Sequence, residues 1–350
     1  MVQLENMRFL KRTPKKEISG KVAILRTDLN IQGIEDAYRL EAALPTIQFL
    51  LKRRVRVIVI SHRGRPNGRD SNLSLNLVVP FLEKRLRKIP VFFRDIPEVL
   101  PEGSLFLIEN LRFWAGEETG NEEFVKKLAS LADFYVNDAF AASHRSDASI
   151  TKLPKFLPAY GGLLLEKEIV TLSRVMKSPQ KPLILIFGGL KIGEKISVIK
   201  HFLKKAKAVL LRSSSLNIRL LSLKSKKILK PVDWVGANGS VLDIGKETVE
   251  KYLDVIKKAK TIIWNGPVGK FEDSQYAAGS VAVANAVARS KAFSVIGGGE
   301  TTQLVSRLGL LKKFSFVSTG GGAMLKFLAG HELPGLTALE ENDKLKIKKQ

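Results

Sequence analysis

Short runs of β-branched and other apolar residues alternate with helical patterns along almost the whole chain. In the first half KVAILRTDLN precedes RLEAALPTIQFLLKRR, and VRVIVISHRGRPNG precedes LSLNLVVPFLEKRLRK; in the second half KPLILIFGGLK, KTIIWNGPVG and AFSVIGGGE repeat the scheme. This alternation is typical of an α/β fold, in which helices cover both faces of a mostly parallel sheet. Ligands of such sheets bind at the carboxyl ends of the strands, so the residues that follow each run are the candidate site residues.

The chain is long enough for two such sheets. With 350 residues, of which 45% are hydrophobic, it can bury two ordinary cores. The segment LLLEKEIVTLSRVMKSPQKP has the pattern of one helix that ends at Ser178-Pro179, and we interpret it as a connector. We therefore predict two doubly wound domains, the first at residues 1–163 and the second at 181–330, joined by a helix at 164–180.

The composition excludes several classes of protein. The chain has no cysteine, which excludes a disulfide framework, a thiolate nucleophile and a zinc–thiolate site. The N-terminal segment MVQLENMRFLKRTPKKE lacks the apolar centre of a signal peptide, and no apolar run approaches the roughly 18 residues that span a bilayer. We therefore expect a cytoplasmic protein without a membrane partner.

The net charge of +24 is unusual and attracts anionic ligands over a distance. Nucleic acid is the obvious rival explanation. The basic residues are spread along the chain, from Lys52-Arg53-Arg54 to Lys312-Lys313 and the KLKIKK tail, and aromatic residues make up only 7%. Because no basic stripe is interleaved with aromatics, we interpret the excess as solvated surface charge and expect no nucleic-acid partner.

Three glycine clusters in the second half each follow an apolar run. They are Gly188-Gly189, Gly297-Gly298-Gly299 and Gly320-Gly321-Gly322. Glycines at a strand-to-helix turn let backbone N–H groups approach phosphate oxygens, and a helix N-terminus there adds a favourable field. The spacing of a Walker loop is absent, so the clusters predict phosphate binding of another kind.

Charged residues beside the glycines extend this pattern. Lys191 and Lys195 are four residues apart, so both amines can point from one helical face at a phosphate chain; a plain turn with solvated lysines is the alternative. Glu300 and Thr301 follow the second cluster, where the carboxylate can hold Mg²⁺ or can simply complement a helix dipole. Glu272, after WNGPVG, can accept from ribose hydroxyls or face solvent.

The first half supplies cations instead of glycines. The candidate residues lie in RTDLN, YRLEAALPTI, SHRGRP, ENLRF and NDAFAASHR, and they are Asp28, Asn30, Arg39, His62, Arg65, Arg112 and Arg145. The planar fork of arginine matches carboxylate and phosphate oxygens in pairs, so several converging arginines suit a small, doubly anionic substrate. Each arginine alone is more often a surface ion-pair partner. Neither His62 nor His144 has a Ser or Asp partner at triad spacing, so we assign neither as a general base.

Together these segments resemble the phosphoglycerate kinase family over most of the chain. RTDLN, YRLEAALPTI, SHRGRP, ENLRF and VNDAFAASHR resemble its substrate segments, and GGLKIGEKI, WNGPVGKFE, IGGGETT and STGGGA resemble its nucleotide segments. HELPGLTAL resembles the closing segment that returns to the first domain, which implies that role for residues 331–350. The resemblance implies a monomer that transfers a phosphoryl group reversibly from 1,3-bisphosphoglycerate to ADP, giving 3-phosphoglycerate and ATP in glycolysis.

The resemblance also implies a role for each matching residue. Phosphoglycerate would be bound by Asp28, Asn30, Arg39, His62, Arg65, Arg112 and Arg145. Arg39, Lys191 and Lys195 would stabilise the charge on the moving phosphoryl group. The nucleotide and its Mg²⁺ would be bound by Gly188, Gly189, Lys195, Glu272, Gly298, Gly299, Glu300, Thr301, Gly320, Gly321 and Gly322, with Glu300 at the metal. Substrates held on separate domains imply a closure before reaction.

The second half departs from the family pattern. After KAVLL the family has a further glycine run and a long helical insertion, whereas here Arg212 precedes Ser213, Ser214 and Ser215, and the segment to PVDW is short. These serines predict weaker discrimination among purine nucleotides. Glu300 replaces the family's aspartate and is one methylene longer, and Mg²⁺ tolerates little error in the position of a ligand. Two functions stay open at this point: an active but trimmed kinase, and a catalytically impaired relative that binds polyanions such as nucleic acid.

Overall fold

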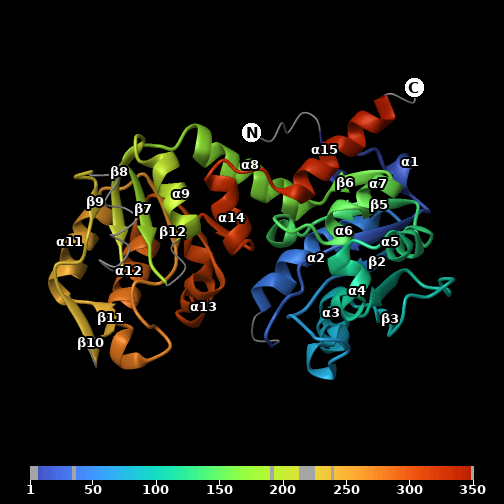
Figure 1. The fold of residues 1–350 in the computed structure, drawn as a ribbon, viewed down its shortest axis with the longest axis horizontal. Helices are drawn as coiled ribbons and strands as arrows, with labels where there is room; N and C mark the ends of the chain where they lie inside the picture. The colour runs from blue at the N-terminus through green and yellow to red at the C-terminus, as the bar shows by residue number, and fades with distance from the viewer. Residues whose placement is uncertain (1–6, 34–36, 190–192, 213–224, 238–239, 348–350) are drawn as a thin grey trace. The chain divides into compact units, whose positions relative to one another are not determined.

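The fold consists of two compact α/β units (Figure 1). The computed structural model describes residues 7–33, 37–189, 193–212, 225–237 and 240–347. Unit 1 comprises Met1–Ile169 and Glu332–Gln350, and unit 2 comprises Val170–His331. No helix in these described ranges is long and apolar enough to cross a membrane.

Unit 1 is built on a six-stranded parallel sheet in the order β3-β4-β2-β1-β5-β6. Its strands are β1 (Val22–Arg26), β2 (Arg56–Ile60), β3 (Val91–Phe93), β4 (Leu105–Ile108), β5 (Phe134–Asn137) and β6 (Ala159–Gly161). The central strands are buried almost throughout, which explains their continuous apolar sequence.

The helices of unit 1 connect these strands. They are α1 (Lys15–Ile18), α2 (Ala37–Lys52), α3 (Val79–Leu86), α4 (Ala115–Thr119), α5 (Glu122–Ala129), α6 (Ala148–Thr151) and α7 (Leu153–Phe156). The last helix of the chain, α15 (Pro334–Ile347), packs against α6, α7 and β6. Asn342 fixes this contact, because its amide donates to Leu157 O at 2.9 Å and accepts from Ala159 N at 3.0 Å.

Unit 2 contains a second six-stranded parallel sheet, in the order β14-β13-β12-β7-β8-β9. Its strands are β7 (Leu183–Phe187), β8 (Ala206–Leu211), β9 (Ile228–Leu229), β12 (Thr261–Asn265), β13 (Phe293–Gly297) and β14 (Phe316–Ser318). A separate antiparallel pair is formed by β10 (Trp234–Ala237) and β11 (Ser240–Ile244), which the sequence patterns did not predict.

The helices of unit 2 are α9 (Gly193–Phe202), α11 (Lys246–Lys257), α12 (Ala278–Arg289), α13 (Gly299–Arg307) and α14 (Gly321–Leu328). The predicted connector is a single helix, α8 (Leu163–Lys177), and the division between the units falls within it. The fold class predicted from the sequence is confirmed. The proposed boundaries at residues 163 and 181 stay a prediction.

Candidate active site

The predicted cations of unit 1 gather at the carboxyl edge of its sheet. Parallel strands end at the same edge, so the loops after β1, β2, β4 and β5 lie together there. These loops carry Asp28 and Asn30, His62 and Arg65, Arg112, and Arg145, respectively, while Arg39 comes from the first turn of α2.

A hydrogen-bonded chain joins three of these elements. The Arg39 guanidinium donates to the Asp28 carboxylate at 2.7 Å and to the Asn30 carbonyl at 3.2 Å. The Asn30 side chain in turn accepts from Gly64 N at 2.8 Å. Asp28 and Asn30 therefore fix α2 and the histidine-bearing loop against each other, and Asp28 partly neutralises Arg39.

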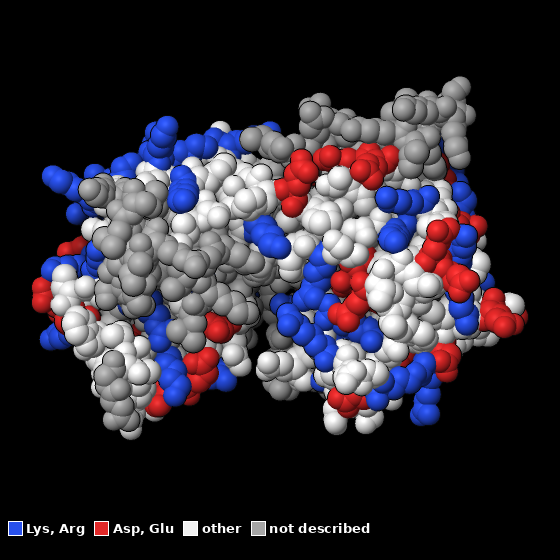
Figure 2. Space-filling view, in the orientation of Figure 1, with Lys and Arg blue, Asp and Glu red and all other residues white. Residues whose placement is uncertain are grey.

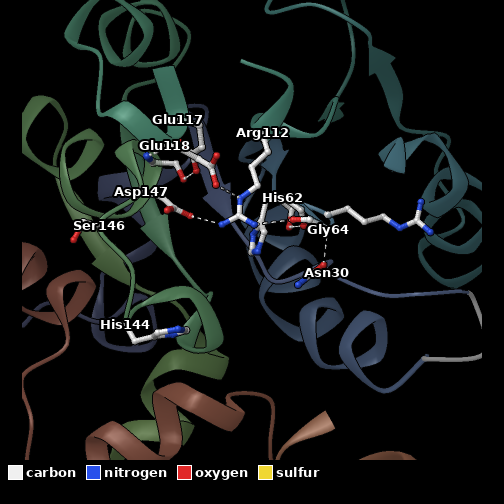
Figure 3. Close-up of polar contacts among 12 residues, drawn as sticks. Asn30, His62, Gly64, Arg112, Glu117, Glu118, His144, Ser146 and Asp147 are labelled. Carbon is white, nitrogen blue, oxygen red and sulfur yellow. Dashed lines mark hydrogen bonds and ion pairs between the residues drawn. The ribbon is translucent and has the colours of Figure 1, made fainter. Parts of the chain in front are cut away.

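Arg112 lies at the centre of the cluster with its side chain buried (Figure 3). It donates to Gly64 O at 2.7 Å, and it lies 3.3 Å from the Glu118 carboxylate and 3.5 Å from that of Asp147. Two carboxylates and one carbonyl hold the guanidinium in place, so its position does not depend on a ligand. The sequence patterns identified Arg112 but not its partners Glu118 and Asp147.

His62 is a neutral hydrogen-bond donor in this site. Its Nδ1 lies 2.9 Å from the Arg26 guanidinium, which can only donate, so Nδ1 accepts and the ring proton is on Nε2. Nε2 is buried and makes no hydrogen bond with any described residue. Burial, together with the positive charges of Arg26, Arg112, Arg145 and Arg39, lowers the pKa of His62 well below its ordinary value. A donor without a partner inside a cationic cluster suits an anionic ligand.

Arg26, which the sequence patterns missed, holds His62 in this tautomer. It ends β1, is fully buried, and donates from Nε to Ser149 Oγ at 2.9 Å. Ser149 Oγ donates onward to the buried carboxylate of Glu117 at 2.6 Å. Burial raises the pKa of Glu117, and the charge of Arg26 opposes that rise. The only sequence signal was an arginine at the end of an otherwise apolar strand.

Arg145 and Arg65 complete the cationic side of unit 1. Arg145 is half-buried, and its pKa is lowered by burial and by the nearby charges of Arg112, Arg65 and Arg26, while Asp147 opposes the shift. Arg65 is exposed on the loop after His62. The positive charges of these arginines repel one another. An anion placed among them is therefore attracted by several cations at once.

In unit 2 the first glycine cluster lies where two strand ends approach closely. A Cβ at Gly188 would collide with the carbonyl oxygens of Pro267 and Gly266, so only glycine fits. Lys195, near the start of α9, is buried and donates to the Gly188 carbonyl. A Cβ at Gly189 would lie 3.2 Å from Glu300 Oε2 and 3.3 Å from Lys195 Nζ, so these two charged groups converge over this turn.

The other two clusters begin helices beside the first. Gly298 precedes α13 with φ +100°, and Gly320 precedes α14; a Cβ at Gly321 would lie 2.9 Å from the Gly298 Cα. The starts of α13 and α14 therefore lie together, and their free N–H groups favour a phosphate. Thr301 Oγ1 accepts from Gly266 N at 2.7 Å and ties α13 to the turn after β12.

Not every predicted residue is brought into these clusters. Glu272 is exposed on the loop after β12. Lys191 lies outside the described residues, as do Ser213, Ser214 and Ser215. Gly299 and Gly322 lie in the first turns of α13 and α14, respectively.

Comparison with known proteins decides the family. The phosphoglycerate kinase family model matches residues 13–215 and 215–331. The phosphoglycerate kinase of Wolbachia pipientis wMel is 36% identical over 386 residues, covering 93% of this chain and 97% of that protein. The chain belongs to the phosphoglycerate kinase family. The resemblance found in the sequence is therefore confirmed.

Solved structures of phosphoglycerate kinases share the fold. The structure from Coxiella burnetii has a TM-score of 0.80 and 31% sequence identity to this chain. The match covers 96% of this chain and 99% of the Coxiella chain. The structure from Pyrococcus horikoshii OT3 has a TM-score of 0.83 and 32% sequence identity. The match covers 99% of this chain and 100% of the Pyrococcus chain.

The phosphoglycerate kinase match is interrupted in unit 2. The two matched segments meet at Ser215, and the alignment to the Wolbachia enzyme runs over 386 residues, more than the 350 of this chain. Part of the relative's length therefore has no counterpart here.

Proposed function

We propose which residues bind the substrates and the metal in the phosphotransferase reaction of this family. The chain is a phosphoglycerate kinase, an enzyme with a carboxyl group as phosphoryl acceptor. Our proposal is that it transfers a phosphoryl group from 1,3-bisphosphoglycerate to ADP and releases 3-phosphoglycerate and ATP. The site assignment rests on the Nε2–H of His62, a buried donor without a partner among the described residues. Four arginines surround it, namely Arg26, Arg112, Arg145 and Arg39.

The ligand of unit 1 is proposed to be 3-phosphoglycerate or 1,3-bisphosphoglycerate. His62 Nε2–H supplies one neutral donor, while Arg65, Arg112 and Arg145 supply cationic forks for phosphate and carboxylate oxygens. Asp28 and Asn30 contribute by holding the loops, and Arg39 extends from α2 toward the carboxyl end of the ligand. Arg39 and Arg112 are already held by carboxylates, so they lose little conformational entropy when the ligand binds.

The ligand of unit 2 is proposed to be ADP or ATP. The phosphates are assigned to Gly188, Gly189 and Lys195 and to the starts of α13 and α14, where N–H groups converge. This second set comprises Gly298, Gly299, Glu300, Thr301, Gly320, Gly321 and Gly322. Glu272 is proposed to accept from the ribose.

Mg²⁺ is proposed to bind at Glu300. No group of three His, Cys, Asp or Glu side chains that could hold a metal occurs in the described ranges. One carboxylate beside a phosphate site fits Mg²⁺, which commonly takes one or two carboxylates and completes its shell with phosphates and water. The ion supplies positive charge to the phosphate oxygens; the protein's part is to place Glu300 next to Lys195 over the Gly189 turn.

We assign no general base among the described residues of the site, and the proposed reaction needs none. In the direction of ATP consumption the nucleophile is a carboxylate, which is already ionised near neutral pH. His62 cannot accept a proton, because Nδ1 accepts from Arg26 and Nε2 already carries hydrogen. Catalysis then depends on in-line placement and on cations around the moving phosphoryl group, which we assign to Arg39, Lys191 and Lys195.

We further propose that the enzyme is cytoplasmic, since its cysteine-free composition suits a reducing compartment. We also propose that it is a monomer. Sedimentation at micromolar concentration tests the oligomeric state.

A steady-state assay with 3-phosphoglycerate and MgATP tests the main proposal. Arg39→Ala should lower kcat by about 10²-fold or more with a smaller change in KM, because its charge acts mainly in the transition state. Arg94→Ala, which removes an exposed arginine of the same unit, is the matched control and should leave both constants unchanged. Absence of turnover in the unmodified enzyme, or an unchanged kcat in Arg39→Ala, would contradict the proposal.

A further inference from the structure

The amino edge of the unit 2 sheet is lined by basic side chains. Six described segments lead into its strands or include their first residues, at residues 177–182, 203–207, 225–227, 257–260, 289–292 and 308–315, and none of these segments contains Asp or Glu. Their exposed basic residues are Lys177, Lys181, Lys204, Lys207, Lys226, Lys257, Lys258, Lys260, Arg289, Lys291, Lys312 and Lys313, which we call the basic edge. None of these side chains makes an ion pair with a residue that the structure describes.

The sheet brings these residues together although they are scattered along the sequence. All six strands are parallel, so every connection that precedes a strand lies at the same edge, opposite the edge that carries the glycine clusters. Six strands at a spacing of about 4.8 Å make a row roughly 24 Å long. Figure 2 shows lysine and arginine side chains along the margin of unit 2 near β8 and α9, at the upper left.

Helix ends account for only part of this charge. Lys177, Lys257 and Arg289 end α8, α11 and α12, where a cation complements the helix dipole. Lys258 is the C-cap of α11, and Lys312 and Lys313 lie in the short 3-10 helix Leu311–Lys313. The other six members lie in the loops or, for Lys207, at the start of β8. Unpaired like charges in a row repel one another and gain nothing from the fold, so their presence without a single carboxylate points to an external anion.

The chemistry of the basic edge selects one kind of partner. The exposed large apolar side chains of the described chain, such as Val170, Trp234 and Val235, lie outside the six connections. The edge therefore has neither an apolar anchor for a bilayer or a protein partner nor an aromatic platform for unstacked bases. Exposed lysines with a single arginine suit the regularly spaced phosphates of a duplex, where affinity comes from released counterions.

We propose that the basic edge binds the phosphate backbone of double-stranded nucleic acid without sequence preference. This binding is separate from the kinase reaction, because it uses the opposite edge of the unit 2 sheet. The proposal departs from the expectation, drawn from the sequence, of solvated surface charge without a nucleic-acid partner. The proximity of these lysines arises only from the parallel order of the strands, which their spread along the sequence does not reveal.

The test is fluorescence anisotropy of a labelled DNA duplex of about 20 base pairs, measured with the full chain across a series of salt concentrations. The edge variant combines Lys181→Gln, Lys207→Gln, Lys260→Gln and Lys291→Gln. The control variant combines the same number of exposed lysines from unit 1, namely Lys16→Gln, Lys84→Gln, Lys88→Gln and Lys155→Gln. Both lower the net charge equally, and kinase activity, expected unchanged in both, reports that they fold.

We expect the unmodified protein to bind the duplex at low salt, with log Kd rising linearly with log salt. In the edge variant the slope of log Kd against log salt should decrease by about 0.9 for each phosphate contact removed. In the control variant the slope should stay the same. Equal loss in both variants would show diffuse charge and overturn the proposal. Absence of duplex binding at low salt, or tighter binding of a single strand of the same length, would also overturn it. Kinase turnover is measured separately, so failure of one proposal does not decide the other.

Discussion

Replacing Asp138 by asparagine is expected to stabilise unit 1 at neutral pH. Asp138 follows β5 and is fully buried, and its Oδ1 accepts from Leu164 N at 2.9 Å and Leu165 N at 3.1 Å at the start of α8. Asparagine keeps this acceptor and is an equally good group at a helix N-terminus. The substitution therefore removes the charge while it preserves the contacts to α8.

The magnitude follows from the pKa of Asp138, which burial raises from 3.8 to about 6 although hydrogen bonds from Thr46, Leu165 and Leu164 oppose the rise. A shift of about 2 pKa units corresponds to about 3 kcal/mol. Because the folded pKa is above the unfolded one, the carboxylate lowers the free energy of unfolding at pH above 6. That loss diminishes as the pH falls through 6 and is gone below 3.8, where both states are protonated.

Amide hydrogen exchange of β5 measures this effect, because its slowest amides exchange only when unit 1 unfolds. At pH 7.5 Asp138→Asn should slow that exchange by up to about 150-fold relative to the unmodified protein, and at pH 4 the two should differ little. Asp133→Asn is the control, since the exposed Asp133 carboxylate also accepts a backbone N–H, from Val22 at 2.8 Å. Faster exchange in Asp138→Asn at pH 7.5, or the same difference at both pH values, would refute this reasoning.

Three further predictions concern the two sites. Gly188→Ala should raise KM for the nucleotide at least tenfold and leave KM for 3-phosphoglycerate unchanged, because the added methyl displaces only the unit 2 turn; equal changes in both constants would argue against this. Ser149→Ala should lower the free energy of unfolding by about 2–4 kcal/mol in urea titration, since it leaves buried groups of Arg26 and Glu117 without their shared partner, and a loss below 1 kcal/mol would show that they find another. The serines at 213–215 predict that kcat/KM for GDP and IDP lies within about tenfold of that for ADP, and a strong preference for ADP would contradict it.

The sequence was sufficient for the fold class and for most of the cationic site. Buried parallel strands such as β1, β2 and β7 are continuous apolar runs, and the residues that follow them must lie at one edge of a sheet. That rule alone brought together Asp28 and His62, which are far apart in the chain. It also placed the three glycine clusters side by side.

The parts that could not be predicted depend on packing between distant side chains. Arg26 looked like the end of a strand, and only the fold shows that it meets His62, Ser149 and, through Ser149, Glu117. The tautomer of His62 follows from that contact and has no local signal. The basic edge likewise needs the order of all six strands.

The most direct test of the central claim is the ¹⁵N–¹H spectrum of the His62 imidazole, assigned by its loss in His62→Gln. The structure requires a neutral ring near neutral pH, with hydrogen on Nε2 and none on Nδ1, because burial and the surrounding arginines lower the pKa of His62 well below its ordinary value. Addition of 3-phosphoglycerate should shift the Nε2–H signal as it gains an acceptor. A protonated Nδ1, or an Nε2–H signal that does not move at saturating 3-phosphoglycerate, would contradict the assignment of this cluster as the phosphoglycerate site.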